Sequence, residues 1–256
     1  MKTDQNREEY SKRIRLTIAY DGTNYVGWQI QKNGISIQQK INEAVSDLFG
    51  TPIEVTGASR TDAGVHALGN VAAFDVVTRM SPDKISYALN TRLPEDIVVV
   101  ASEEVSPDFH PRFDALEKTY EYHILNRPFS DPLKRLNCYF YHHNLDVEKM
   151  KMACAPLVGE HDFTSFASIH SQTKSFVRTI YQLGVHREDD EIIIRITGNG
   201  FLYNMVRIIA GTLIQMGAGL RDPAEMSDIL CGCDRGLAGP TAPAKGLVLV
   251  EIYYEA

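Results

Sequence analysis

The residues best suited to chemistry lie together in the string Ala58-Ser59-Arg60-Thr61-Asp62-Ala63-Gly64-Val65-His66-Ala67. Asp62 stands between an arginine and an Ala-Gly pair whose glycine allows a tight turn. Strand-like runs at 53–56 and 71–74 would hold both ends of this loop, and loops on rigid scaffolds commonly carry catalytic groups. An ionised carboxylate beside Arg60 suits a nucleophile that faces an anionic polymer. An ordinary Asx turn between two hairpin strands would use the same residue types.

Six further strings carry a resemblance that extends over nearly the whole chain. They are Tyr20-Asp21-Gly22-Thr23, Gly27-Trp28-Gln29, Lys118-Thr119-Tyr120-Glu121-Tyr122, His161-Asp162-Phe163-Thr164-Ser165-Phe166, Asn199-Gly200-Phe201-Leu202-Tyr203-Asn204-Met205-Val206-Arg207 and Ala242-Pro243-Ala244-Lys245-Gly246-Leu247. Together with the string around Asp62, they resemble the motifs of the TruA family of tRNA pseudouridine synthases. Ser59 stands where many relatives have Gly, a small-for-small change that we expect to be neutral.

The resemblance implies an isomerase that acts on uridines at positions 38, 39 and 40 of the tRNA anticodon stem-loop. This reaction breaks the N-glycosidic bond, turns the base and rejoins it through C5. Because no redox change and no external group is involved, we expect no cofactor and no metal, only an ionised carboxylate. The resemblance also implies a homodimer with tRNA spanning both subunits, and we expect the protein to be cytoplasmic and not bound to a membrane.

Asp62 is the expected catalytic nucleophile, and its attack on the sugar C1′ or on the uracil C6 is left open by the residues. A buried carboxylate stays ionised only when a positive charge is close. The resemblance implies that the catalytic Arg207 pairs with Asp62 across a cleft and supplies that charge. The neighbours of Arg207 are apolar, so the charge must face water, a ligand or a partner. A snorkelling surface arginine is the alternative.

Three residues are expected to touch the substrate. Tyr120 would stack on the uracil and move the C5 proton through its hydroxyl, although packing against a helix is its plain alternative. The resemblance implies that Arg60 fills the gap left by the flipped uridine and binds phosphate, whereas the sequence alone would allow a simple salt bridge with Asp62. Leu247 matches a position that packs against the target base in relatives.

Apolar periodicity predicts an α+β fold of two halves, each in the ferredoxin-like order β-α-β-β-α-β. The expected elements are 14–20, 37–49, 53–56, 71–74, 82–93 and 97–101 in the first half, and 119–125, 147–158, 176–186, 191–197, 201–216 and 247–253 in the second. Ser36 with Gln39, Ser81 and Asp146 would cap the starts of the first three helices, Gly50 would end the first, and the acids 188–190 would form a hairpin turn. The halves would be 1–107, with a polar tail over 1–12, and 108–256. We expect them to form one antiparallel sheet with helices on one side, and the resemblance adds a central cleft.

Composition limits the partners. The 256 residues carry a net charge of −7, which by itself argues against a nucleic-acid partner. The acids gather at 4–9, 103–108 and 188–191, whereas the segments 163–187 and 198–221 contain arginines and a lysine but no acid. This distribution is compatible with one basic face on an otherwise acidic protein.

Membrane, secretion and zinc signals are missing from the sequence. No run has the length of a membrane span, and residues 1–13 contain no hydrophobic stretch of the kind found in a secretory signal. The cysteines and histidines do not show the spacing of a metal site, so we expect free thiols. The residues concerned are Cys138, Cys154, Cys231, Cys233, His142, His143, His161 and His170.

Two other functions fit parts of this pattern. A non-catalytic RNA-binding protein made of two RRM-like units would share the same element order, so the fold alone does not decide. The sequence contains no RNP1-type string of paired aromatics, and it keeps Asp62, Tyr120 and Arg207 together, which favours catalysis. A relative that acts on another RNA or another position would keep the same three residues.

Overall fold

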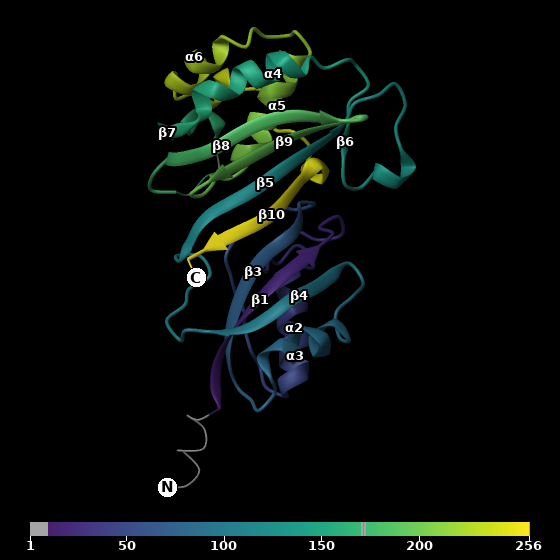
Figure 1. Ribbon diagram of the computed structural model, residues 1–256, viewed down its shortest axis with the longest axis vertical. Helices are drawn as coiled ribbons and strands as arrows, with labels where there is room; N and C mark the ends of the chain where they lie inside the picture. The colour runs from purple at the N-terminus through teal and green to yellow at the C-terminus, as the bar shows by residue number, and fades with distance from the viewer. Residues whose placement is uncertain (1–9, 170, 172, 256) are drawn as a thin grey trace. The chain divides into compact units, whose positions relative to one another are not determined.

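The computed structural model of the protein describes residues 10–169, 171 and 173–255. It is a mixed α+β fold with a ten-stranded sheet, which confirms the fold class predicted from the sequence (Figure 1). The chain divides into two compact units. Unit 1 extends to Leu116 and takes in the stretch that begins at Leu249, and unit 2 is Glu117–Val248. Residues 1–9 of the expected tail and His170 lie outside the described residues.

The strands of unit 1 are β1 (Ser11–Tyr20), β2 (Thr56–Gly57), β3 (His66–Val77), β4 (Ile97–Val105) and most of β10 (Leu247–Tyr254). β1 pairs antiparallel with both β3 and β4. Alternate residues of a strand point to opposite faces, and β1 buries Ile14, Leu16, Ile18 and Tyr20 on one of them. Because β1 begins at Ser11, the end of the expected tail is part of the sheet.

The helices of unit 1 are α2 (Ile37–Phe49) and α3 (Pro82–Asn90), which give the predicted ferredoxin-like order β1-α2-β2-β3-α3-β4. The predicted ends of α2 are confirmed. The hydroxyl of Ser36 accepts the N–H of Gln39, and Gly50 ends the helix in the left-handed conformation with φ 67°. A side-chain oxygen at the start and a glycine at the end satisfy backbone groups that the helix leaves unpaired.

Both helices cover the same face of the sheet in unit 1. The ring of Phe49 in α2 lies 6.0 Å from that of Phe74, which pairs with Ile14. In α3, the side chain of Asn90 donates to the carbonyl of Val99 and accepts its N–H, and Val99 pairs with Ile18. The apolar face of β1 therefore faces the core of unit 1, and neither α2 nor α3 covers the opposite face.

The strands of unit 2 are β5 (Ala115–Leu125), β6 (Tyr139–Phe140), β7 (Gly159–Asp162), β8 (Val177–Glu188) and β9 (Glu191–Gly198). They are ordered β5-β9-β8-β7 with antiparallel registers, and β6 adds to β5 in parallel. The predicted hairpin between β8 and β9 is confirmed, and its turn contains Asp189 with φ 50°. Aspartate tolerates this left-handed conformation better than most residues.

The helices of unit 2 are α4 (Val147–Cys154), α5 (Met205–Gly217) and α6 (Glu225–Cys231). Short 3₁₀ turns lie at Pro132–Lys134, Ala155–Leu157, Thr164–Phe166, Arg235–Leu237 and Ala244–Gly246. As predicted, Asp146 caps α4, because its carboxylate accepts the N–H groups of Glu148 and Lys149. The N–H of Asp146 also donates to the carbonyl of Gly217 at 2.8 Å, which ties α4 to the end of α5.

The strand predicted at 53–56 is wrong over most of its length. Only Thr56–Gly57 pairs with β3. The N–H of Ile53 donates to Ser46 Oγ at 2.9 Å, and the N–H of Val55 donates to Asn42 Oδ1 at 2.9 Å. Two side chains of α2 therefore take the hydrogen bonds that a sheet partner would otherwise provide.

Three predicted helices have different ends in the structure. The helix predicted at 147–158 ends at Cys154 and is followed by the 3₁₀ turn Ala155–Leu157. The helix predicted at 201–216 begins at Met205, because Asn204 adopts the left-handed conformation with φ 63° and cannot continue a right-handed helix. The helix predicted at 82–93 ends at Asn90, and Ser81 makes no side-chain cap to the backbone. The hydroxyl of Ser81 instead donates to the side chain of Asp83.

Within the described ranges, no helix is both long and apolar enough to cross a membrane. The same residues contain no group of three or more histidine, cysteine or acidic side chains that could hold a metal ion. All four cysteines are free: Cys138 and Cys154 are buried, and Cys231 and Cys233 are exposed.

Candidate active site

Asp62 lies in unit 1 on the loop 58–65 that joins β2 to β3. At the start of the loop, the N–H of Ala58 donates a hydrogen bond to the carbonyl of Val71 at 2.8 Å. It turns where the N–H of Val65 donates to the carbonyl of Asp62 at 3.1 Å, with Gly64 at φ 75°. A positive φ at the third residue is what a type II turn requires, which explains the glycine. The half-buried Asp62 is thus the first residue of a tight turn held by two strands.

The residue before Asp62 is fixed by a buried polar network. The hydroxyl of Tyr20 lies 2.7 Å from Thr61 Oγ1. Asn70 donates through its side-chain amide to the Tyr20 oxygen and to the carbonyl of Ser59, each at 3.1 Å. The backbone N–H of Trp28 donates to the carbonyl of Thr61 at 3.0 Å, and Trp28 is only 2% exposed. Buried hydrogen bonds of this kind orient a loop because breaking one leaves an unsatisfied polar group.

Two glycines let neighbouring backbone approach this loop closely. Gly27 has φ 106°, and a Cβ there would lie 2.6 Å from the carbonyl oxygen of Thr61. A Cβ at Gly22 would lie 2.0 Å from the carbonyl oxygen of Val65. Any side chain at either place would push the loop away. The segments 20–23 and 27–29 therefore pack directly against the backbone of the Asp62 loop and fix its position.

His66 closes the other end of the loop. Its Nδ1 lies 3.0 Å from Asp21 Oδ1 and 3.1 Å from the N–H nitrogen of Gly22. Burial alone would raise the pKa of Asp21, but hydrogen bonds from Thr23 and the interaction with His66 outweigh it and hold that pKa below its ordinary value. Sequence reasoning assigned no role to His66, Tyr20 or Asn70, although His66 and Tyr20 lie inside the quoted strings.

Arg207 lies in unit 2, in the first turn of α5. Its Nε donates to the carbonyl of Ala242 at 2.8 Å, and its Nη1 donates to Asn204 Oδ1 at 2.8 Å. The N–H of Ala242 donates back to the carbonyl of Arg207 at 3.0 Å. The guanidinium is half-buried and held in place by these bonds, which does not fit a freely snorkelling side chain. The left-handed Asn204 that delays the helix also supplies one of its anchors.

Tyr120 and Tyr122 share one face of β5. Tyr120 is 8% exposed, and its ring meets that of Phe201 edge to face at 5.3 Å. Tyr122 is fully buried, and its hydroxyl donates to the carbonyl of Pro243 at 2.9 Å. Burial raises the pKa of Tyr122, and the positive charge of Arg207 opposes that rise. Tyr122 thus packs against the segment that holds Arg207, while Tyr120, also buried, packs against Phe201.

Leu247 follows the 3₁₀ turn Ala244–Gly246 and begins β10. It is 6% exposed. A Cβ at Gly246 would lie 2.7 Å from the ring of Tyr122, so the glycine brings this turn directly onto that ring. Unit 2 therefore gathers Arg207, Tyr122 and the turn before Leu247 into one packed cluster. Of the predicted site residues, Asp62 and Arg60 belong to unit 1, and Tyr120, Arg207 and Leu247 belong to unit 2.

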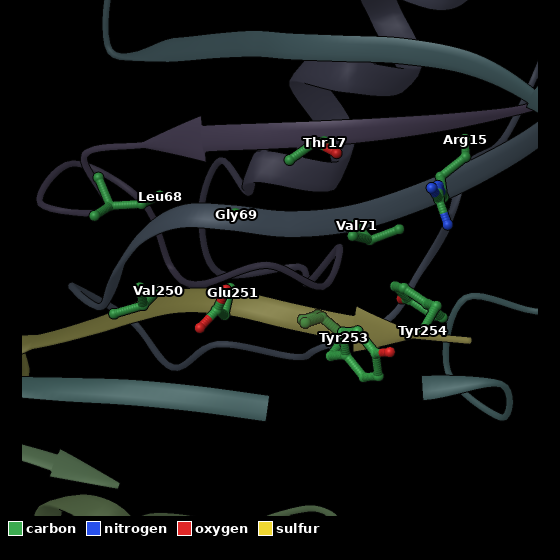
Figure 2. Close-up of a pocket in the computed structure, with 10 residues that line it drawn as sticks. Arg15, Thr17, Leu68, Gly69, Val71, Val250, Glu251, Tyr253 and Tyr254 are labelled. Carbon is green, nitrogen blue, oxygen red and sulfur yellow. The ribbon is translucent and has the colours of Figure 1, made fainter. Parts of the chain in front are cut away.

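Two other features do not contribute to this site. Asn199-Gly200 precedes α5 by several residues and continues the β8–β9 pairing: Asn199 and Thr179 exchange hydrogen bonds at 3.0 Å. The backbone N–H groups of Asn199-Gly200 therefore do not form a helix N-terminus of the kind that binds phosphate. Residues of β1, β3 and β10 in unit 1 line a hollow of about 400 Å³, and Figure 2 draws these residues as sticks. None of the predicted site residues lines it.

Comparison with known proteins identifies the family. The family model described as tRNA pseudouridine synthase matches residues 16–114 and 153–255. A tRNA pseudouridine synthase A of Ruminiclostridium cellulolyticum is 50% identical over 244 residues, which cover 95% of this chain and 100% of that protein. Proteins of the same name from Acetivibrio thermocellus and Brevibacillus brevis are 48% and 47% identical with the same coverage.

The chain therefore belongs to the tRNA pseudouridine synthase family, and the resemblance seen in its motifs is confirmed. Membership makes it an isomerase that converts uridine to pseudouridine in tRNA.

Proposed function

We propose that this chain isomerises uridine at positions 38, 39 and 40 in the anticodon stem-loop of tRNA, with Asp62 as the nucleophile and without a cofactor or a metal. The observation that carries the proposal is the anchored turn at Asp62. Its neighbour Thr61 is bound to Tyr20 and Trp28 on one side, and Gly64 sets the turn on the other. A carboxylate held in this way keeps one orientation toward a bound nucleoside.

The reaction needs a carboxylate and a route for one proton. The bond between N1 of uracil and C1′ of the ribose breaks, and its electron pair stays with the base. Asp62 assists this step by attack on C1′ or on C6 of the uracil. The base turns and C5 bonds to C1′, the bond made by Asp62 breaks and returns its carboxylate, the C5 proton leaves and N1 gains a proton. Product and substrate are isomers, so no redox partner or group donor enters the balance.

Arg207 and Tyr120 complete the proposed catalytic set. In the proposal, the guanidinium of Arg207 faces Asp62 and keeps it ionised as the base is released. Its two hydrogen bonds, to Ala242 and Asn204, would fix its position for that purpose. Tyr120 would stack on the turned uracil and pass on the C5 proton through its hydroxyl. Tyr120 is 8% exposed, whereas Tyr122 on the same face of β5 is fully buried.

Arg60 and Leu247 would bind the substrate. Flipping a uridine out of a paired stem costs a few kcal/mol. Arg60 is exposed and directly precedes Thr61, so its planar side chain can stack in the gap and offset part of that cost. Leu247 would pack against the flipped base. tRNA is the only partner that the proposal requires besides a second copy of the chain in a homodimer, and a cytoplasmic location follows from that substrate.

The position of modification is tested with tRNA transcripts that contain a single uridine in the anticodon arm, at 38, 39 or 40. We expect pseudouridine at each of these positions after incubation with the purified protein, mapped by reverse-transcription stops after carbodiimide treatment. Transcripts with the uridine elsewhere in the stem-loop serve as the control. Modification confined to such control positions would contradict the proposed target.

A further inference from the structure

We propose that Arg112 and Arg60 form a binding site for a phosphate of the RNA strand, with the exposed ring of Phe113 beside it as a stacking surface for a base. The inference rests on the proposed function, since it takes tRNA as the ligand. All three residues belong to unit 1. Sequence reasoning gave Arg60 a role in substrate binding and gave none to residues 109–114.

The segment 109–114 forms a turn that is fixed by its own hydrogen bonds. Nδ1 of His110 accepts the N–H groups of Arg112 and Phe113, each at 3.2 Å. Asp114 accepts the N–H of His110 at 2.8 Å through its carboxylate and donates its own N–H to the carbonyl of His110 at 3.1 Å. A ring nitrogen that accepts two N–H groups carries no proton, so His110 is held in one tautomer. The turn therefore presents the side chain of Arg112 from a fixed backbone.

The turn is also anchored to the sheet of unit 1. The hydroxyl of Tyr254 donates to the carbonyl of Pro111 at 2.7 Å, and the ring of Tyr254 lies 5.2 Å from that of Phe109. Nε of Arg13 donates to the carbonyl of Phe109 at 2.6 Å. The guanidinium of Arg15 lies 5.4 Å from the ring of Tyr254, and the two side chains lie together at one end of the hollow (Figure 2).

The same part of the sheet holds the loop that carries Arg60. Gly69 and Val71 of β3 line the hollow together with Tyr254. Between them lies Asn70, whose amide binds the carbonyl of Ser59, the residue before Arg60. Neighbouring strands thus anchor both arginine-bearing segments, and neither depends on unit 2 for its backbone conformation.

Four other described arginines of unit 1 have partners within it. Arg13, Arg15 and Arg92 each form an ion pair, with Asp75, Glu103 and Asp47 respectively, and Arg79 lies over the ring of Tyr10 at 4.9 Å. Among the described residues, the guanidinium groups of Arg60 and Arg112 make no hydrogen bond or ion pair. Burial lowers the pKa of the half-buried Arg112, and the positive charge of Arg60 lowers it further. Like charges held near each other, one of them partly desolvated, favour an anionic ligand.

A phosphodiester group is the anion that an RNA strand would bring to this site. Guanidinium groups bind phosphate through paired, charge-assisted hydrogen bonds, and two of them can share one phosphate group. Phe113 is 77% exposed and stacks on His110 with ring centroids 4.2 Å apart. An exposed aromatic ring next to unpaired cations is the usual combination on surfaces that bind single-stranded nucleic acid. A free small anion would gain nothing from that ring.

The experiment compares tRNA binding by wild type, Arg112→Gln, Arg112→Lys and Arg92→Gln across a range of salt concentrations. We expect Arg112→Gln to weaken tRNA binding about tenfold at low salt, the effect of losing one charged hydrogen-bonded contact. The slope of log Kd against log salt concentration should fall by about 1, the amount expected for the loss of one phosphate contact. Arg112→Lys should keep the slope and lose part of the affinity, because a lysine retains the charge without the fork. Arg92→Gln, which removes an ion-paired arginine, should bind as wild type does.

Steady-state turnover over a range of tRNA concentrations separates this inference from the proposed function. We expect Arg112→Gln to raise KM and leave kcat close to wild type, with an unchanged melting temperature. Equal Kd and equal salt slope for Arg112→Gln and wild type would overturn the phosphate site, even if both isomerise uridine. Normal tRNA binding with no isomerisation by wild type would instead overturn the proposed function. The variant Phe113→Ser tests whether this surface instead binds a second copy of the chain. A changed oligomeric state with an unchanged Kd for tRNA would overturn the site.

Discussion

The hydroxyl of Tyr20 lies 2.7 Å from Oγ1 of Thr61, the residue that precedes Asp62. Tyr20 ends the first strand of the chain, so this contact joins the start of the sheet to the loop that carries the carboxylate. Both side chains are buried, with Tyr20 5% and Thr61 7% exposed. The position of Asp62 therefore depends on a hydrogen bond that is made far from it in the sequence.

Replacing Tyr20 with phenylalanine should lower both stability and turnover. The change leaves Thr61 Oγ1 and the Asn70 amide without a partner they now share, at a cost of about 1–3 kcal/mol in the free energy of unfolding. Because the turn at Asp62 loses one anchor, kcat should fall and KM for tRNA should change little. Denaturant unfolding and steady-state kinetics measure the two effects.

Tyr25→Phe is the matched control for that prediction. The hydroxyl of Tyr25 donates to Asp96 at 2.6 Å, away from Thr61. This variant should lose stability and keep its kcat. Equal loss of kcat in both variants would mean that the Tyr20–Thr61 contact has no special role in positioning.

Gly27→Ala should be far more harmful than Gly50→Ala. Both glycines have positive φ, so both substitutions carry a backbone cost of roughly 1–2 kcal/mol. At Gly50 nothing lies within 4 Å of a new Cβ, whereas at Gly27 the Cβ would meet the carbonyl of Thr61 at 2.6 Å. We expect Gly27→Ala to reduce turnover strongly and Gly50→Ala to leave it unchanged. Comparable activity in the two folded variants would show that the loop tolerates displacement.

Signals confined to one segment could be predicted from the sequence. The cap at Ser36, the stop at Gly50 and the acidic hairpin turn depend on neighbouring residues, and all three are found as predicted. The turn at Asp62 could also be anticipated, because Gly64 is the residue that its backbone requires. Local chemistry was sufficient in each case.

Features that depend on distant partners could not be predicted in the same way. The run 53–56 has strand-like residues, yet its N–H groups bind side chains of α2. The late start of α5 has a local cause that apolar periodicity also misses, because Asn204 turns left-handed and its side chain accepts a hydrogen bond from Arg207. The buried network of Tyr20, Asn70 and Thr61 likewise joins three separate elements. Periodicity carries no information about which element will supply such partners.

Asp21→Asn should lower stability at neutral pH and have less effect in acid. The folded state holds the pKa of Asp21 below its ordinary value. A lowered carboxyl pKa contributes stability above the unfolded pKa of about 4, and this contribution is lost as the pH falls through the folded pKa. The side chain is 44% exposed, so solvent screening keeps the effect small. Melting temperatures of the two proteins should converge as the pH falls below the folded-state pKa of Asp21. A constant difference between pH 7 and acid would contradict the assignment.

Two of the four thiols should react readily in the folded protein. Cys231 and Cys233 are exposed, and Cys138 and Cys154 are buried. Burial, with the nearby Glu191, raises the pKa of Cys138 to about 11, and burial raises that of Cys154 to about 12. At pH 8 a disulfide reagent should therefore label two thiols quickly and the other two only after denaturation. The double variant Cys231→Ser/Cys233→Ser should show no fast phase. A fast phase that persists in it would mean that a buried thiol is accessible.

The central claim is that Asp62 is the nucleophile of uridine isomerisation. Tritium release from tRNA carrying 5-tritiated uridine tests it most directly, because loss of the C5 hydrogen accompanies the new carbon–carbon bond. We compare wild type, Asp62→Asn and the surface control Asp47→Asn, with tRNA binding measured for each. The account predicts release by wild type and Asp47→Asn, and none above background by Asp62→Asn despite near-normal binding. Release by Asp62→Asn at more than a few per cent of the wild-type rate would contradict it.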